Sequence, residues 1–222
     1  MRHCIAAVGA AVALTVPSFG AVVPFTEAFD SSASNWRNAA GAANATWLPT
    51  GGPGNSAHIT GATSVNNANT GVVIALRAQD AFNSSNDAFV GNWLALGVTA
   101  FSFDVRHDAP APMSFGARFA PSANAPGAIG FQFAPVAPGQ WSTVTIPIDP
   151  SFPGFVSFEF GNFAGIFSGI GNVQVSYLVP GALADSGTIV NVAVDNVRLL
   201  PAPGSAAILA LAGTLALRRR RR

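Results

Sequence analysis

Short segments in which apolar and polar residues alternate recur along the central part of this chain. In one of them, Phe101, Phe103 and Val105 are separated by single polar residues. Successive side chains of a β-strand point to opposite faces, so a period of two predicts strands that bury one face and expose the other. About ten strands are predicted in this way, near residues 25–29, 57–60, 72–76, 101–106, 114–119, 131–133, 144–148, 156–160, 173–176 and 190–194.

Turn-forming residues separate these segments. Pro and Gly gather in residues 108–112 and 121–127, and again in the pairs Pro138-Gly139 and Pro153-Gly154. The strands therefore follow one another at intervals of roughly 10–15 residues, and no long stretch has a helical period. This organisation predicts an all-β protein with an antiparallel β-sandwich.

The number of strands favours a jelly roll over an immunoglobulin-like topology. One folded domain is expected at residues 22–200, and this is longer than the roughly 100 residues of an immunoglobulin-like sandwich. Residues 162–170 fit one or two helical turns beside the core. Residues 35–69 are rich in Gly, Asn, Ser and Ala and are expected to be mostly loop.

The beginning of the chain has the pattern of a secretory signal peptide. A short basic start is followed by a twelve-residue apolar run from Ile5 to Val16, and the small residues Ser18 and Gly20 precede a cleavage point. Residues 1–21 are therefore expected to form a signal helix that is removed on export. Cys4, the one cysteine of the sequence, would be lost with it, so the mature protein would have no disulfide.

The end of the chain has three elements in a fixed order. A proline motif and a twelve-residue apolar segment, expected to form a short helix, precede a terminal run of arginines. At about 18 Å, such a helix is shorter than the ~30 Å hydrocarbon core, so it would act as a temporary anchor. The residues of the motif and of the basic run are Pro201, Ala202, Pro203, Arg218, Arg219, Arg220, Arg221 and Arg222.

This order of elements resembles the PEP-CTERM sorting tail, here in a Pro-Ala-Pro form over residues 201–222. The resemblance implies recognition by a membrane protease of the exosortase type and association with extracellular polysaccharide. Ala202 stands where the family usually has Glu. The alternative interpretation is an ordinary tail anchor.

The charge between the two ends excludes one class of partner. Residues 22–200 contain five arginines and ten acidic residues, and the sequence contains no lysine, so the net charge of this part is −5. Nucleic-acid binding depends on clustered basic residues, which this part lacks. DNA and RNA are therefore not expected as partners.

The first and last predicted strands resemble those of jelly-roll carbohydrate-binding modules. The similarity lies in residues 25–30, in Trp36, Trp47 and the turn at residues 51–54, and in the closing segment 194–197. In such modules a structural calcium often ties the first strand to the last. The matching oxygen donors are Glu27, Asp30 and Asp195, and the alternative is that these are solvated carboxylates at strand ends.

The polar side of the middle strands supplies candidate ligand-binding residues. Sugar recognition uses planar hydrogen-bonding groups together with an aromatic platform. The residues of this kind are Asp104, Arg106, Arg118, Gln132, Trp93 and Trp141. The alternative is ordinary cross-strand Arg–Asp pairing, with the tryptophans in the core.

Catalytic motifs are lacking in the body. His58 and His107, the histidines outside the leader, form no metal-type pair, and no Gly-x-Ser-x-Gly elbow is present. We therefore expect an exported, non-catalytic protein of the cell surface or extracellular matrix that binds polysaccharide. A structural matrix protein without a ligand is the second hypothesis, and an enzyme acting on glycosides through two carboxylates is the third.

Overall fold

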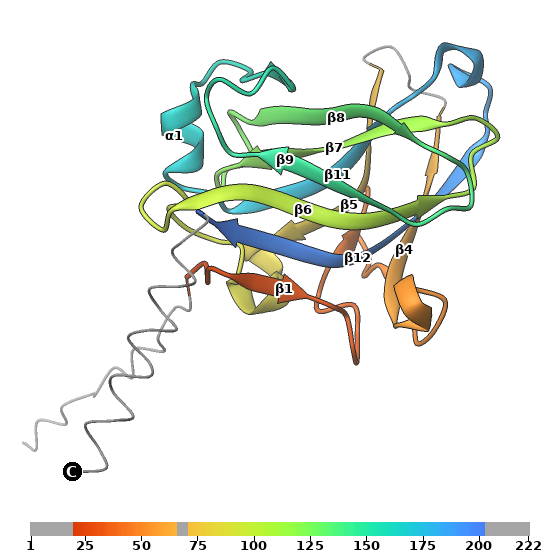
Figure 1. Cartoon of the computed structure of the whole chain (residues 1–222), viewed down its shortest axis with the longest axis horizontal. Helices are drawn as coiled ribbons and strands as arrows, with labels where there is room; N and C mark the ends of the chain where they lie inside the picture. Colours follow the sequence, from red (N-terminus) through yellow and green to blue (C-terminus); the bar gives the residue numbers. More distant parts are fainter. Residues whose placement is uncertain (1–19, 66–70, 203–222) are drawn as a thin grey trace, which may run out of the picture.

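The computed structural model describes residues 20–65 and 71–202. The predicted signal peptide and sorting tail fall almost wholly outside these ranges. In the described part, twelve β-strands form two sheets that pack face to face (Figure 1). The strands are β1 (Phe25–Glu27), β2 (Arg37–Asn38), β3 (Thr46–Leu48), β4 (His58–Ser64), β5 (Val72–Gln79), β6 (Val98–His107), β7 (Met113–Ala120), β8 (Ala128–Val136), β9 (Ser142–Pro147), β10 (Phe155–Ser157), β11 (Asn172–Leu178) and β12 (Ile189–Pro201).

The two sheets have six described strands each. Sheet A has the order β3-β4-β12-β6-β9, with β1 also paired to β12, and sheet B has the order β10-β8-β7-β11-β5-β2. All strand pairs are antiparallel, and the chain passes repeatedly from one sheet to the other. In Figure 1, β1 lies beside β12, although they are at opposite ends of the domain sequence. The predicted antiparallel sandwich of jelly-roll type is therefore confirmed.

The core lies between the sheets and is built largely from aromatic rings. Phe101 and Phe103 from sheet A meet Phe115 and Phe119 from sheet B, and all four are fully buried. The rings of Phe101 and Phe119 are 5.4 Å apart in an edge-to-face arrangement. Each such side chain contributes about 1.5–3 kcal/mol through burial. The alternating positions of β6 and β7 therefore supply the inner faces of the sandwich, as their period of two predicts.

The predicted helical turns at residues 162–170 are present as α1 (Phe163–Phe167). The side chain of Asn162 accepts a hydrogen bond from the amide of Gly165 and so caps the helix. Ile166 and Phe167 are buried. Among residues 20–65 and 71–202, none of the helices has the length and hydropathy needed to cross a membrane.

Most of the described residues 35–65 lie outside strands, as expected, and β4 matches the strand predicted near residues 57–60, but the short strands β2 and β3 were not predicted. The two short strands lie at sheet edges, where β2 pairs with β5 and β3 pairs with β4. Trp47 of β3 donates its indole N–H to the carbonyl oxygen of Phe29 at 2.7 Å. These strands form because a neighbouring strand supplies hydrogen bonds, which local composition does not reveal.

Candidate functional site on the outer face of sheet A

The outer face of sheet A carries polar side chains at positions that alternate with the core residues. On β6, Ser102, Asp104 and Arg106 point away from the core, since Phe101, Phe103 and Val105 point into it. The strand register places Thr60 of β4 opposite Ala193 of β12, and Ala193 opposite Arg106. A methyl side chain therefore lies between two longer polar ones.

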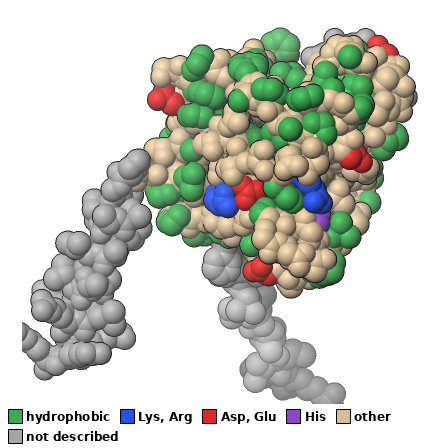
Figure 2. Space-filling view, turned by 45° about the vertical axis from the view of Figure 1, so that its right-hand side comes forward, with side chains coloured by type: hydrophobic (Ala, Val, Ile, Leu, Met, Phe, Trp, Pro, Cys, Tyr) green, Lys and Arg blue, Asp and Glu red, His purple; other side chains and the backbone are tan. Residues whose placement is uncertain are grey.

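A pocket of about 340 Å³ lies over this row. Ala193 forms part of its floor, because its short side chain leaves space between β4 and β6. The pocket is lined mainly by polar residues of β4, β6 and β12 and by the loops beside them. The lining residues are Leu48, His58, Thr60, Arg106, His107, Asp108, Gly139, Asn191 and Ala193. Charged side chains are sparse on the face of the molecule shown in Figure 2. A basic side chain lies beside an acidic one at one place on this face and beside a histidine at another.

Arg106 lines this pocket, and its guanidinium packs against the ring of Trp141, which lies next to the pocket. The guanidinium carbon lies 4.9 Å from the centre of the Trp141 ring, which is a cation–π contact. The indole N–H of Trp141 donates to the carbonyl oxygen of Gly51 at 3.1 Å. His58 meets the same ring edge-on, with ring centres 5.5 Å apart. The aromatic ring is thus held in place from two sides, and it supports the guanidinium on one face.

His58 is a buried imidazole with an unused nitrogen. Its side chain belongs to a residue that is 2% exposed, and its Nδ1 has no hydrogen-bond partner. Burial lowers the pKa of His58 below its ordinary value, and the positive charge of Arg106 lowers this pKa further. His58 is therefore neutral at pH 7.

The carboxylate of Asp108 is already engaged at the other end of the pocket. Its two oxygens accept from the backbone N–H of Asn191 at 2.7 Å and from the side-chain amide of Asn191 at 2.6 Å. This pair ties the strand end of β6 to β12. It also fixes the orientation of the Asn191 amide at the pocket wall.

Two carboxylates lie side by side on the same face, next to the pocket. Asp104 of β6 is directly opposite Asp195 of β12. Asp195 is fully buried and accepts from the hydroxyl of Ser56 at 2.7 Å. The Asn196 side-chain amide donates to both acids, at 2.9 Å to Asp104 and 3.3 Å to Asp195.

The two acids differ in how their charge is balanced. Asp104 also accepts from Thr143 at 2.6 Å and forms an ion pair with Arg198 at 3.3 Å. Burial raises the pKa of Asp195, and the nearby charge of Asp104 adds to this rise although the Ser56 and Asn196 hydrogen bonds oppose it. Asp104 and Asp195 therefore belong to a buried network of hydrogen bonds that joins β6, β12 and the loop before β4.

The structure brings three of the six predicted ligand-binding residues to one face. Asp104, Arg106 and Trp141 all belong to the outer side of sheet A. Arg118 and Gln132 belong to sheet B instead. The prediction of one shared cleft is therefore wrong, because Arg118 lies on the outer side of sheet B and Gln132, which is paired with the buried Phe115, points between the two sheets. Alternation alone does not say to which sheet a strand belongs.

The two predicted residues of sheet B have structural partners. Arg118 forms a forked contact with Glu159, with Nε–Oε1 2.7 Å and Nη2–Oε2 3.0 Å, and it donates to Asn124 as well. Gln132 accepts from the backbone N–H of Thr145 at 3.0 Å, which links β8 of sheet B to β9 of sheet A. Both side chains hold parts of the fold together.

Trp93 is wrongly predicted as a binding platform. It is fully buried, and its ring packs against Phe101, Phe119 and Phe167 at centre distances of 5.4–6.1 Å. Its indole N–H donates to the carbonyl oxygen of Phe89 at 2.8 Å. The alternative interpretation of this tryptophan as a core residue is the correct one.

The three donors that the resemblance implies for calcium do not come together. Glu27 accepts from the backbone N–H of Phe29 at 2.9 Å, and Asp195 is engaged by Ser56 and Asn196. Over residues 20–65 and 71–202, no three His, Cys, Asp or Glu side chains form a group that could hold a metal ion. Glu27, Asp30 and Asp195 therefore do not make the implied three-carboxylate site.

Sequence reasoning did not identify Thr60, Asp108 and Asn191 as neighbours of Arg106. Asn191 and Ala193 are the outward residues in the alternation of β12, so one signal for this face was present. The missing information was the position of β12 between β4 and β6. That order depends on strands more than 80 residues apart in sequence.

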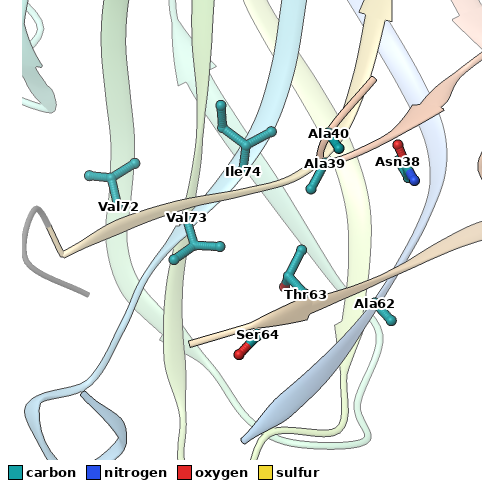
Figure 3. Close-up of a pocket in the computed structure, with 9 residues that line it drawn as sticks. All are labelled: Asn38, Ala39, Ala40, Ala62, Thr63, Ser64, Val72, Val73 and Ile74. Carbon is teal, nitrogen blue, oxygen red and sulfur yellow. The ribbon is translucent and has the colours of Figure 1, made fainter. Parts of the chain in front are cut away.

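A second pocket, of about 400 Å³, lies between β4 and β5 where the two sheets part. Thr63 and Val73 point toward one another across it (Figure 3). No charged or aromatic side chain is among its lining residues, and the Thr63 hydroxyl is paired with the Tyr177 hydroxyl at 2.7 Å. The pocket on sheet A has the richer chemistry and is the candidate site.

No family model and no curated protein matches the chain. Solved structures with a similar arrangement include a Clostridium thermocellum xylanase 10B fragment with CBM22-1 and GH10 modules, with TM-score 0.49, 12% identity and 80% of this chain covered. An exo-β-agarase matches with TM-score 0.48 and 15% identity, and the match covers 82% of this chain. A xylan-binding domain from CBM22 matches with TM-score 0.46 and 13% identity, and that match covers 84% of this chain. The chain spans 28% of the xylanase fragment, 25% of the agarase and 97% of the xylan-binding domain. These similarities assign no family.

Proposed function

We propose that this protein is a non-catalytic polysaccharide-binding protein that uses the pocket on the outer face of sheet A. The observation that carries the proposal is the combination of chemical groups in this pocket. A guanidinium, an imidazole and an amide line about 340 Å³ beside the strands β4, β6 and β12, and the ring of Trp141 lies next to this pocket, against the guanidinium. Sites built on strands hold such groups more accurately than sites built on loops.

The groups suit a sugar chain. Sugar hydroxyls both donate and accept hydrogen bonds, and the pocket offers the donors of Arg106, the hydroxyl of Thr60 and the amide of Asn191. Leu48, 39% exposed, adds apolar surface at the rim, and the half-buried ring of Trp141 lies beside Arg106 and His58. Such a mixture is typical of ligand sites, in which a few placed polar groups accompany apolar contacts.

The carboxylates near the pocket favour binding over cleavage. Glycoside hydrolysis normally needs two carboxyl groups that reach opposite sides of the bond to be broken. Asp104 and Asp195 are 8% and 0% exposed, and the two oxygens of Asp108 are bound to Asn191. None of these three acids is placed to transfer a proton to a bound chain.

A retention experiment separates the binding hypothesis from that of a structural protein without a ligand. The protein is passed over a panel of insoluble polysaccharides, together with Trp141→Ala and with the control Phe133→Ala. Phe133 is 54% exposed on β8 of sheet B and is not part of the pocket. We expect retention of the protein and of the control, and loss of retention by Trp141→Ala. Absence of retention on every polysaccharide would support the structural alternative.

We also propose that the protein is exported and carried to the cell surface or matrix. The signal pattern in residues 1–21 and the proline, apolar and arginine elements of residues 201–222 support this. An exosortase-type protease would be the processing partner. Cell fractionation with N-terminal sequencing tests the proposal, and an intact Met1 on protein recovered from the cytoplasm would contradict it.

A further inference from the structure

Arg106 is a cation whose hydrogen-bonding groups are not used by the described part of the protein. It has the stacking contact with Trp141, but no ion pair or hydrogen bond of its guanidinium is found there. By contrast, Arg118 is paired with Glu159 and Arg198 with Asp104. Arg77 donates to the carbonyl oxygen of Ala39. The unused donors of Arg106 therefore lie at the pocket.

The position of this guanidinium is fixed before any ligand arrives. Trp141 lies under it, and Gly51 and His58 hold Trp141. A long side chain normally loses rotamer freedom when it binds, and support of this kind reduces that loss. The planar guanidinium then offers two parallel donors, which fit the paired oxygens of a carboxylate or a sulfate.

The acidic groups near Arg106 are each occupied by another partner. Asp108 is bound by Asn191, and Asp104 is bound by Thr143, Asn196 and Arg198. Asp195 is buried beneath Ser56. Arg106 is the one arginine among the residues that line the pocket, which also include His58, His107 and the carboxylate of Asp108.

From this arrangement we infer that the polysaccharide bound at the pocket is anionic and that Arg106 binds its carboxylate or sulfate groups. The inference rests on the proposed function and names the class of ligand. Long-range repulsion from the net charge of −5 over residues 22–200 opposes the approach of a polyanion. At physiological ionic strength this repulsion is screened beyond about 8 Å, whereas a direct contact in a pocket is not.

Two pairs of polysaccharides test the inference, because the members of each pair differ mainly in charge. Polygalacturonate is compared with its methyl ester, and dextran sulfate with dextran, by affinity electrophoresis at 0.15 M salt. Neutral insoluble polysaccharides serve as a further panel. The full-length protein is compared with Arg106→Gln and Arg106→Lys, and a thermal melt of each variant verifies that it is folded.

We expect the protein to bind the charged member of at least one pair about tenfold more tightly or better, in keeping with the strength of charge-assisted hydrogen bonds. Preference within the first pair identifies carboxylate, and preference within the second identifies sulfate. Arg106→Gln should lose the preference, and Arg106→Lys should retain part of it, because lysine keeps the charge but not the planar fork.

Four outcomes would overturn the inference. Equal binding to both members of each pair, or binding to neutral polysaccharides alone, would overturn it and leave the proposed function standing. A preference that persists in folded Arg106→Gln would show that another group binds the anion. Absence of binding to every polysaccharide would overturn the proposed function, and this inference with it.

Discussion

The contact between Arg118 and Glu159 allows a quantitative prediction about stability. The Glu159 carboxylate accepts from Arg118 Nε at 2.7 Å, from Arg118 Nη2 at 3.0 Å and from the amide of Gly127 at 2.7 Å. The side chains of Arg118 and Glu159 are 12% and 27% exposed, so solvent screens the pair in part. Fully exposed pairs contribute about 0.2–1 kcal/mol, and hydrogen bonds to charged groups contribute about 1.5–3 kcal/mol.

A value between these limits, about 1–2 kcal/mol, is expected for the loss caused by Glu159→Gln at pH 7. For a domain of this size, about 2–4 °C of melting temperature corresponds to 1 kcal/mol, so the variant should melt roughly 2–8 °C lower. The hydrogen bond from Arg118 is the main cause that lowers the pKa of Glu159 below its ordinary value of 4.5. Because the folded-state pKa is the lower one, this stabilisation is present above pH 4.5 and is lost as the pH falls through the folded-state pKa.

The assay is thermal unfolding of the protein, Glu159→Gln, Arg118→Gln and the double variant, followed by circular dichroism between pH 7 and pH 3. The two single changes should be non-additive at pH 7, with a coupling energy of about 1–2 kcal/mol, and the difference between the protein and Glu159→Gln should shrink toward pH 3. Additive effects at pH 7, or a difference that does not change with pH, would refute the view of Arg118 as a clamp between β7 and the loop after β10.

Three further predictions concern single residues. Burial raises the pKa of Asp195, so this group stabilises the folded state more at low pH than at high pH. The stability of Asp195→Asn relative to the unchanged protein should therefore rise from pH 4 to pH 7 in urea titrations. A fall in this relative stability would contradict the raised pKa. The imidazole of His58 should titrate below 6.5 in an NMR titration, and its midpoint should move upward in Arg106→Gln, where one cause of the lowered pKa is removed. A midpoint at or above 6.5 in the protein would contradict the lowered pKa of His58. Gly116→Ala should lower the free energy of unfolding by about 1–3 kcal/mol. A Cβ at this position would collide with the carbonyl oxygen of Gly130 and come within 2.5 Å of Phe131. Unchanged stability would show that β7 and β8 can separate without cost.

Much of the fold follows from local pattern in the sequence. The alternation in residues 101–106 and 114–119 predicts the strands β6 and β7, with Phe101 and Phe119 facing the core. The apolar spacing of residues 162–170 predicts the short helix α1. These elements are predictable because burial of one face imposes a period on the chain.

The short edge strands β2 and β3 were not predictable in the same way. Their pairing partners, β5 and β4, supply the hydrogen bonds that define them. A two-residue strand such as β2 has too few residues for any alternation to be visible. Its existence is a property of the sheet to which it is added.

The candidate site was predictable only in part, because the local pattern does not show which strands are neighbours in a sheet. The pattern shows that Asp104 and Arg118 both point out of the sandwich, but it does not show that they belong to different sheets. It also does not reveal that Ala193 lies between Thr60 and Arg106, which depends on the register of β12 with two neighbours. Trp93 and Trp141 have similar settings in sequence, and only the packing separates a core ring from one at a pocket.

The indole signals of the four tryptophans test directly whether ligand binds beside Trp141. Each indole N–H has its own partner: Ser85 for Trp36, Phe29 for Trp47, Phe89 for Trp93 and Gly51 for Trp141. A ¹H–¹⁵N spectrum of the protein, titrated with a soluble fragment of the polysaccharide that retains it, follows all four indole signals at once. We expect a saturable shift of the Trp141 signal and unchanged signals for Trp36 and Trp93. Binding that leaves the Trp141 signal unmoved would contradict this expectation.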